Sequence, residues 1–205
     1  MAHQSLPVEL SWPAHLSECG GEALALPSVD CIRTVCRSKF KRGTGLGCDL
    51  IHPFWIAYCS DDLISALALL MLAVEQTGIL PDPFWIKIFL ARKLSGGWRP
   101  IGLLPTFIRV WEAVREGQVQ EWASKNSRDY TWAGKGRSAE GAVWLQALDA
   151  EGAVDPLSAA TCLIDLVKAF EAVPHAVLVA RALQFQFLLV ILRVLLCVFP
   201  WGAAL

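Results

Sequence analysis

Two β-prone runs on either side of a glycine turn predict a β-hairpin in the middle of this 205-residue chain. Residues 84–90 and 98–103 are rich in aromatic and branched side chains, and residues 95–97 between them read Ser-Gly-Gly, a typical turn sequence. Several of the apolar segments around this hairpin have the three- and four-residue spacing of helices. The sequence therefore predicts a mixed α and β protein without internal repeats.

Four positions carry the residue types that start helices. Ser60, followed by two aspartates, can cap a helix that ends near Gly78; because this helix is apolar nearly all round, we expect it to be buried. Thr106 and Ser138 can each cap a helix with apolar residues on one stripe. Pro174 can occupy the first turn of a last helix, which is expected to continue into the apolar tail.

A loosely structured segment is predicted at the start of the chain, and a buried strand is predicted near residue 165. Residues 1–38 contain prolines and glycines without a sustained period, which indicates a loosely structured lead-in. Residues 161–166 are short, apolar and β-prone, and they predict a buried strand that ends near the carboxylate of Asp165.

Composition limits the possible classes of protein. A hydrophobic fraction of 55% is enough for a real core in one or two domains and argues against disorder. The formal net charge of −1 gives no global field for holding nucleic acid, so any affinity must come from local patches. One candidate is the segment 31–42, which holds five basic residues and no acidic one. A solvated, partly flexible segment is the alternative interpretation.

The cysteines indicate a reducing compartment. There are 7, an odd number, without a Cys-x-x-Cys pair or a His-x-x-x-His spacing, which disfavours a zinc site and a disulfide scaffold. The first 30 residues show no secretory leader pattern. We therefore expect an intracellular protein of the cytoplasm or nucleus that is not secreted.

Four blocks of sequence occur in an order typical of one enzyme family. Residues 165–175 read Asp-Leu-Val-Lys-Ala-Phe-Glu-Ala-Val-Pro-His, which resembles the first catalytic motif of reverse transcriptases of the non-LTR retrotransposon and group II intron type. Upstream, residues 41–52 resemble the template-side entry segment of the family. The residues that carry this resemblance are Gly45, Gly47, Asp49 and His52. Residues 90–106 resemble the fingers hairpin, with residues 109–115 as the helix after it, and residues 133–140 resemble the next block, which leads into a fingers helix. The ordered set carries the resemblance, over residues 39–183.

The resemblance implies an α+β fold, the fingers and the beginning of the palm of a right-hand polymerase, truncated before the second catalytic motif and the thumb. On this view residues 1–38 are the lead-in, residues 39–160 a fingers-like region and residues 161–205 the start of the palm. The implied activity is that of an RNA-directed DNA polymerase, which transfers deoxynucleotides to a DNA primer on an RNA template.

The implied catalytic residue is Asp165. Nucleotidyl transfer uses two divalent metals about 4 Å apart, and hard cations such as Mg²⁺ prefer carboxylate oxygens. By the resemblance Asp165 is a Mg²⁺ ligand in the complete enzyme, with the backbone carbonyl of Leu166 beside it. A strand-end or helix-cap aspartate is the structural alternative.

Five further residues are implied to bind substrate. Lys93 and Arg99 match residues of the family that bind the triphosphate. The lysine ammonium is a compact positive charge, and the planar arginine guanidinium can donate two parallel hydrogen bonds to phosphate oxygens. Phe170 matches the ring under the incoming sugar that selects deoxynucleotides. Lys135 and Arg137 match a segment near the template strand, where they would contact phosphates. The alternatives are solvated charges for the hairpin pair and a core phenylalanine for Phe170.

The sequence also departs from the family. The 205 residues contain no aromatic-x-Asp-Asp motif downstream of Asp165, and no Asp or Glu follows His175. One carboxylate cannot hold two metals, so we expect this chain to be inactive alone, as a fragment or a decayed copy.

Two other functions stay open. A non-catalytic remnant could bind nucleic acid through the basic segment and the hairpin. A small membrane-associated protein could use the apolar run 185–205, although the charge of Arg193 within it disfavours a membrane span. The sequence indicates no specific protein partner.

Overall fold

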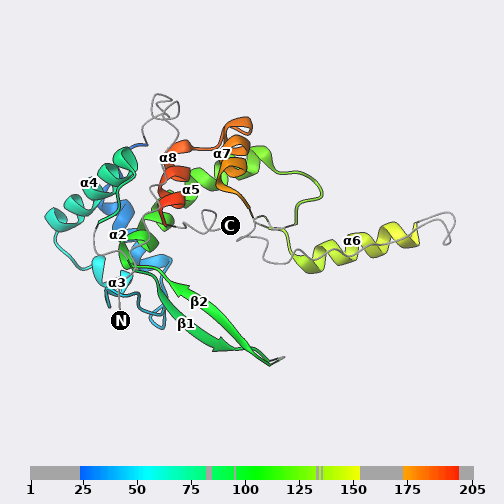
Figure 1. Ribbon diagram of the computed structural model, residues 1–205, viewed down its shortest axis with the longest axis horizontal. Coiled ribbons are helices and arrows are strands. Elements are labelled where there is room, and N and C mark those ends of the chain that lie inside the picture. The colour runs from blue at the N-terminus through cyan, green and yellow to red at the C-terminus, as the bar shows by residue number, and fades with distance from the viewer. Residues whose placement is uncertain are drawn as a thin grey trace. The chain divides into compact units, whose positions relative to one another are not determined.

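The computed structural model describes residues 24–81, 85–94, 96–132, 134, 136–152 and 173–198 (Figure 1). It divides into two compact units, one of Met1–Gly117 with Pro174–Leu205 and one of Gln118–Val173. The elements of the described residues are α2 (Val29–Ser38), α3 (Pro53–Ile56), α4 (Asp61–Thr77), β1 (Lys87–Arg92), β2 (Trp98–Leu103), α5 (Thr106–Asn126), α6 (Ala139–Glu151), α7 (His175–Gln184) and α8 (Leu189–Val198). The prediction of mixed α and β structure is confirmed for this part of the chain.

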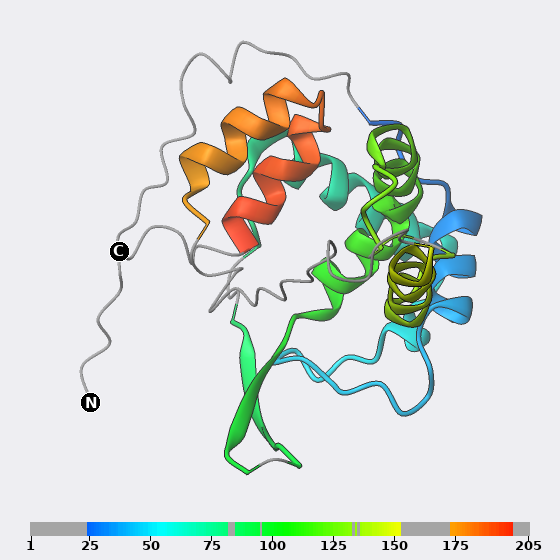
Figure 2. The same ribbon diagram turned by 90° about the vertical axis from the view of Figure 1, so that its right-hand side faces the viewer.

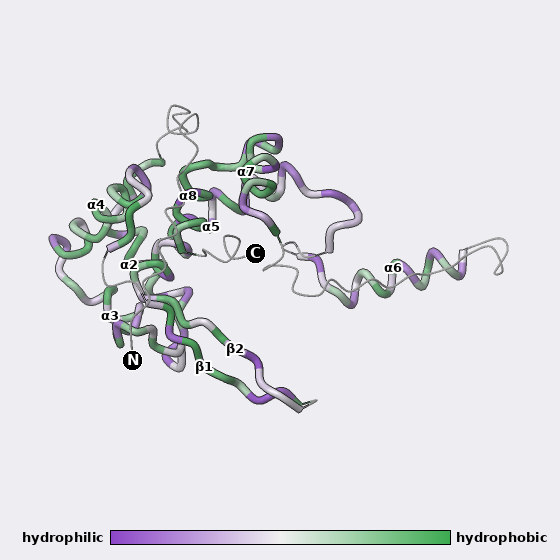
Figure 3. The backbone as a smooth tube through the Cα atoms, in the orientation of Figure 1, coloured by the Kyte–Doolittle hydropathy of each residue, from purple (hydrophilic) through white to green (hydrophobic). Residues whose placement is uncertain are grey.

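Helices pack on helices to form the core of the first unit. Helix α4 lies against α2 and α8, and α7 lies against α8. Figure 3 shows hydrophobic residues along α4 and α8. Four helices contribute two or more fully or almost fully buried side chains each, among them Ile32 and Cys36 of α2, Ile64 and Met71 of α4, Ile108 and Trp111 of α5, and Ile191 and Val194 of α8.

A buried ion pair joins α4 to α5 inside this core. The Glu75 carboxylate accepts hydrogen bonds from Arg115 Nε at 2.6 Å and Nη2 at 2.9 Å, and from Trp111 Nε1 at 2.8 Å. Arg115 Nη1 donates to the carbonyl of Ala25 at 3.0 Å, and Arg193 donates to the backbone carbonyl of Glu75. Buried charges are costly unless paired in this way, so the pair fixes how the helices meet.

Helix α4 begins and ends as predicted. Ser60 Oγ accepts the N–H of Leu63 at 3.4 Å, and Gly78 ends the helix in the left-handed conformation with φ 72°. Its expected burial on all sides is wrong, since Leu63 and Leu69 are 58% and 57% exposed. The helices that pack on α4 leave its outer face uncovered.

The predicted hairpin is confirmed. Strands β1 and β2 are antiparallel, with Ala91 opposite Arg99. Gly96 and Gly97 take φ values of 90° and 82°, which favour glycine, and the N–H of Lys93 donates to the carbonyl of Gly97 at 3.0 Å. The hairpin projects away from the helices of its unit (Figure 2), and most of its side chains are exposed.

The second unit contains the end of α5 and all of α6. Ser138 caps α6 as predicted, because its Oγ accepts the N–H of Gly141 at 3.1 Å. The apolar residues of α6 face solvent among the described residues, with Val143 and Trp144 both 65% exposed.

Residues 29–38 correct the expectation of a loosely structured lead-in. They form helix α2, which Ser28 caps by accepting the N–H of Cys31 at 3.1 Å. Ile32 and Cys36, one turn apart, are fully buried. Val29 and Val35 lie on the same stripe and are partly buried, so the helical spacing is present in residues 29–36, directly after the prolines and glycines of residues 7–27. Residues 1–23 lie outside the described part.

The expected continuous last helix is also wrong. Helix α7 begins directly after Pro174, ends at Gln184, and is separated from α8 by a turn in which Gln186 has φ 52°. The turn is closed by the N–H of Phe187, which donates to the carbonyl of Ala182 at 2.8 Å. Within the described ranges, no helix has the length and apolar character needed to cross a membrane.

Candidate nucleotide and template site

Segment 41–52 lies against the base of the hairpin. A Cβ added at Gly47 would lie 2.5 Å from the carbonyl oxygen of Leu104, so the close approach of these two backbones requires glycine. Cys48 Sγ donates to the carbonyl of Trp85 at 2.9 Å, just before β1. The segment therefore touches both strand ends of the hairpin.

Asp49 fastens the same segment to the start of α5. Its Oδ2 accepts the N–H of Thr106 at 2.6 Å, and its Oδ1 accepts the N–H of Ile51 at 3.3 Å. The hydroxyl of Thr106 donates to the carbonyl of Ile51 at 2.6 Å. Thr106 was expected to cap α5, but it is the first residue of the helix, and the carboxylate of Asp49 satisfies its otherwise unpaired N–H.

Arg109 makes a second connection from α5 to the segment. Its Nη1 donates to the carbonyl of Gly45 at 2.7 Å, and its guanidinium lies 5.5 Å from the ring centroid of Phe40. Burial lowers the pKa of Arg109, whereas the nearby charges of Asp49 and Glu112 raise it. Burial raises the pKa of Glu112, and Arg109 opposes this shift. Arginine stays charged in either case, so the hydrogen bond from Arg109 to Gly45 does not depend on its protonation.

Lys93 and Arg99 lie near the tip of the hairpin. Arg99 pairs with Ala91 of β1, and Lys93 directly follows β1, where its N–H donates to the carbonyl of Gly97 at 3.0 Å. Both basic side chains are exposed, and in the part of the chain that the structure describes neither forms an ion pair. Two exposed positive groups thus lie near the tip of the hairpin.

Arg137 organises its own loop. Its Nη1 donates to the carbonyls of Arg128 at 2.7 Å, Asp129 at 3.1 Å and Thr131 at 2.6 Å, and its guanidinium lies 5.8 Å from the ring centroid of Trp132. These contacts are a structural role that the sequence did not indicate. The other expected site residues, Asp165, Leu166, Phe170 and Lys135, lie outside the described residues.

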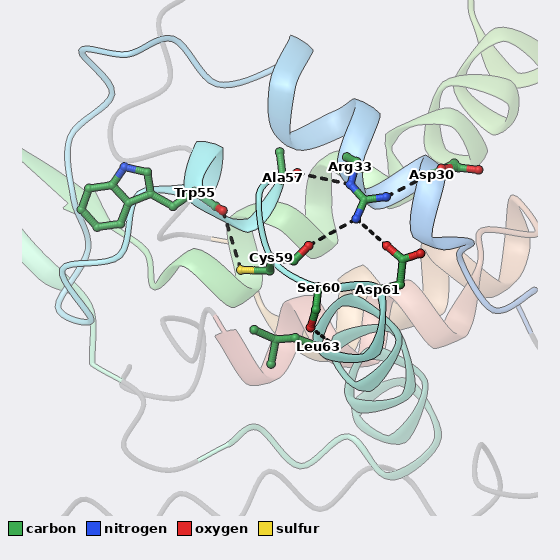
Figure 4. Close-up of polar contacts among 8 residues, drawn as sticks. All are labelled: Asp30, Arg33, Trp55, Ala57, Cys59, Ser60, Asp61 and Leu63. Carbon is green, nitrogen blue, oxygen red and sulfur yellow. Dashed lines mark hydrogen bonds and ion pairs between the residues drawn. The ribbon is translucent and has the colours of Figure 1, made fainter.

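The guanidinium of Arg33, in the basic segment, binds to groups of the protein itself (Figure 4). It donates to the carbonyls of Ala57 at 3.2 Å and Cys59 at 3.3 Å, and its Nη2 lies 2.7 Å from Asp61 Oδ1. These bonds join α2 to the turn before α4. The basic residue therefore serves the fold.

Two more residues of the basic segment have internal partners. Lys39 forms an ion pair with Glu116 at 2.8 Å, and the guanidinium of Arg37 lies 5.7 Å from the ring centroid of Tyr58. Lys41 and Arg42 are exposed, and among the described residues they form no ion pair. The basic segment 31–42 is thus the greater part of α2 and the turn after it. Its exposed charges without an ion pair to a described residue, those of Lys41 and Arg42, lie at its C-terminal end.

No protein-family model, curated protein or solved structure matches this chain. In addition, the described ranges hold no group of three or more His, Cys, Asp or Glu side chains suited to a metal ion. The function has to be inferred from the residues and contacts above.

Proposed function

We propose that this chain forms the fingers and the beginning of the palm of an RNA-directed DNA polymerase. The observation that supports this best is the connection between two of the resembling blocks, the entry segment and the hairpin block with the helix after it. Asp49 and Gly45 of the entry segment are hydrogen-bonded to Thr106 and Arg109, and Gly47 lies against the end of β2. A template base and an incoming nucleotide have to pair, so the groups that hold each must be kept in a fixed relation.

The hairpin supplies the nucleotide-binding groups of the proposal. Lys93 and Arg99 are both exposed near the tip of the hairpin, where an ammonium and a guanidinium can bind phosphate oxygens of a triphosphate. Hydrogen bonds to charged groups are worth about 1.5–3 kcal/mol each. The loss of either side chain should therefore weaken nucleotide binding by about tenfold or more.

The proposed catalytic groups are Asp165 and the carbonyl of Leu166 as Mg²⁺ ligands, with Phe170 beneath the sugar. In the complete enzyme Mg²⁺ would stabilise the attacking and leaving oxygens of phosphoryl transfer. A single carboxylate does not suffice for two such ions, so we propose that the chain alone is inactive. DNA synthesis by the purified chain on an RNA template, abolished by Asp165→Asn, would contradict this.

Nucleotide binding tests the proposal without requiring catalysis. Titration of the intact chain with a fluorescent deoxynucleoside triphosphate and Mg²⁺ should show saturable binding that Lys93→Gln and Arg99→Gln each weaken. Lys125→Gln is the matched control, because Lys125 is an exposed cation of α5 whose ion pair is with Glu121 of the same helix. Equal binding by all four proteins would argue against a nucleotide site on the hairpin.

A non-catalytic nucleic-acid-binding remnant is the second candidate function. Lys41 and Arg42 favour it, because both are exposed and neither forms an ion pair with another of the described residues. Binding to phosphates releases counterions, so affinity for an oligonucleotide should fall steeply with salt. Oligonucleotide binding without any affinity for nucleotides would favour the remnant, and an affinity that is independent of salt would exclude it.

A further inference from the structure

A row of flat side chains crosses the short helix α3. The rings of Trp55 and His52 have centroids 6.2 Å apart, those of His52 and Phe54 6.4 Å, and those of Phe54 and Tyr58 5.2 Å. The guanidinium of Arg37 follows at 5.7 Å from the centroid of the Tyr58 ring. Five neighbouring groups with flat faces therefore connect α3 to the end of α2.

The inner rings anchor this row and the outer rings project from it. His52 is only 7% exposed, and its Nδ1 accepts the N–H of Phe54 at 3.1 Å, which caps α3. Trp55 and Tyr58, in contrast, are 59% and 68% exposed. Figure 4 shows Trp55 pointing away from the contacts of Arg33. Two large aromatic rings are thus exposed at the surface, each in contact with a neighbouring ring of the row.

Most charged residues in the sequence around these rings are basic, and Arg37 lies directly over the ring of Tyr58. Between residues 31 and 60 the sequence has one acidic residue, Asp49, which is bound to the start of α5. Asp61, at the neighbouring turn, is paired with Arg33. Lys41 and Arg42 are exposed in the segment that leads to α3. A polyanion would meet basic groups here, and two of the nearby carboxylates, Asp49 and Asp61, already have partners within the protein.

We propose that this surface, which we define as the α3 platform of Trp55, Tyr58 and Arg37, binds single-stranded nucleic acid. Bases stack on exposed aromatic rings whatever their sequence, and arginine adds contacts to phosphates and rings. Duplex DNA or RNA buries its base faces, so the platform selects single strands. The inference rests on the proposed function, because segment 41–52 leads directly into α3 and the strand bound there is then the template.

Binding of a labelled single-stranded RNA of mixed sequence to the intact chain tests the platform. By fluorescence anisotropy, Trp55→Ala and Tyr58→Ala should each raise the dissociation constant by about tenfold, whereas Tyr58→Phe, which keeps the ring, should have little effect. Arg37→Gln should reduce the salt dependence by about one released counterion. Trp144→Ala is the matched control, since Trp144 is 65% exposed on α6 in the other unit.

The outcomes separate this inference from the proposed function. If the unaltered chain binds RNA and both alanine variants bind equally well, the platform is wrong and the proposed function stands; the rings then serve a different partner, such as a protein. Equal weakening by Trp144→Ala, or equal competition by duplex RNA, also overturns the platform. If the unaltered chain fails to bind RNA at low salt, both proposals fall. Thermal melting of each variant shows that a loss of binding is not a loss of fold.

Discussion

Asp49, Arg109 and Glu75 show how much of this fold depends on single polar side chains. Asp49 is hydrogen-bonded to Thr106, 57 residues further along the sequence, and Arg109 is hydrogen-bonded to Gly45, 64 residues before it. Glu75 sits among apolar residues on the buried face of α4, where its charge is matched by Arg115. The sequence did not indicate these roles, because each depends on a partner that only the tertiary structure brings close.

The Glu75 and Arg115 pair gives the first prediction. Glu75→Gln leaves the guanidinium buried without its counter-charge and should lower the free energy of unfolding by about 3–5 kcal/mol. Glu75→Leu combined with Arg115→Met should recover part of this loss, since no charge is then buried. The measurement is urea unfolding followed by circular dichroism. Glu121→Gln, in an exposed pair with Lys125, should cause no measurable change, and an equally small effect at Glu75 would contradict the assigned role.

Cys36 gives a prediction for the dependence of stability on pH. Burial raises the pKa of the Cys36 thiol from 9.0 to about 11, and the nearby Cys59 adds to the shift. The unfolded chain releases this proton at lower pH than the folded chain does. The contribution of Cys36 is therefore fully present below pH 9 and is lost as the pH rises toward 11.

Urea unfolding between pH 8 and pH 11 measures this effect, with the window set by the two pKa values of Cys36. Because other groups titrate in the same range, the quantity of interest is the difference between the unaltered chain and Cys36→Ala. The free energy of unfolding should fall less steeply with pH in the variant. Parallel curves for the two proteins would show that the thiol is not buried as described.

At the scale of elements, the sequence predicted what local chemistry decides. The turn glycines of the hairpin, the Ser60 and Gly78 boundaries of α4 and the Ser138 cap of α6 are all signals within a few residues of the element. Helix α2 was missed although Val29, Ile32, Val35 and Cys36 have helical spacing, because the helix is only 10 residues long and follows the prolines and glycines of residues 7–27. The break between α7 and α8 was missed because residues 185–188 contain no glycine or proline, so tertiary packing sets the break.

The contact between the entry segment and the end of β2 gives a prediction at this scale. Gly47→Ala places a Cβ against the carbonyl of Leu104 and should lower the free energy of unfolding by about 1–3 kcal/mol. Gly43→Ala, four residues earlier, is the control, because a Cβ there meets nothing within 4 Å. Differential scanning calorimetry of the two variants should show a lower melting temperature for Gly47→Ala alone. Equal melting temperatures would mean that the segment is not held against the hairpin.

At the scale of the whole molecule, the sequence placed Lys93 and Arg99 in a hairpin, and both are exposed near its tip; their role at a triphosphate stays a prediction. Sequence order alone could not show that segment 41–52 is bound to α5, nor that Arg33, Lys39 and Arg137 have partners within the protein. The aromatic row at α3 was missed as well, because its rings come from positions that have no simple period.

Photo-crosslinking of an azido-deoxynucleoside triphosphate to the intact chain in the presence of Mg²⁺ tests the central claim most directly. Peptide mass spectrometry should locate the attached nucleotide within Lys87–Arg92 or Trp98–Leu103, the two strands of the hairpin, or the turn between them. Excess unlabelled deoxynucleoside triphosphate should prevent the attachment. Labelling that survives this competition, or that is as frequent on α6 as on the hairpin, would contradict a polymerase fingers region.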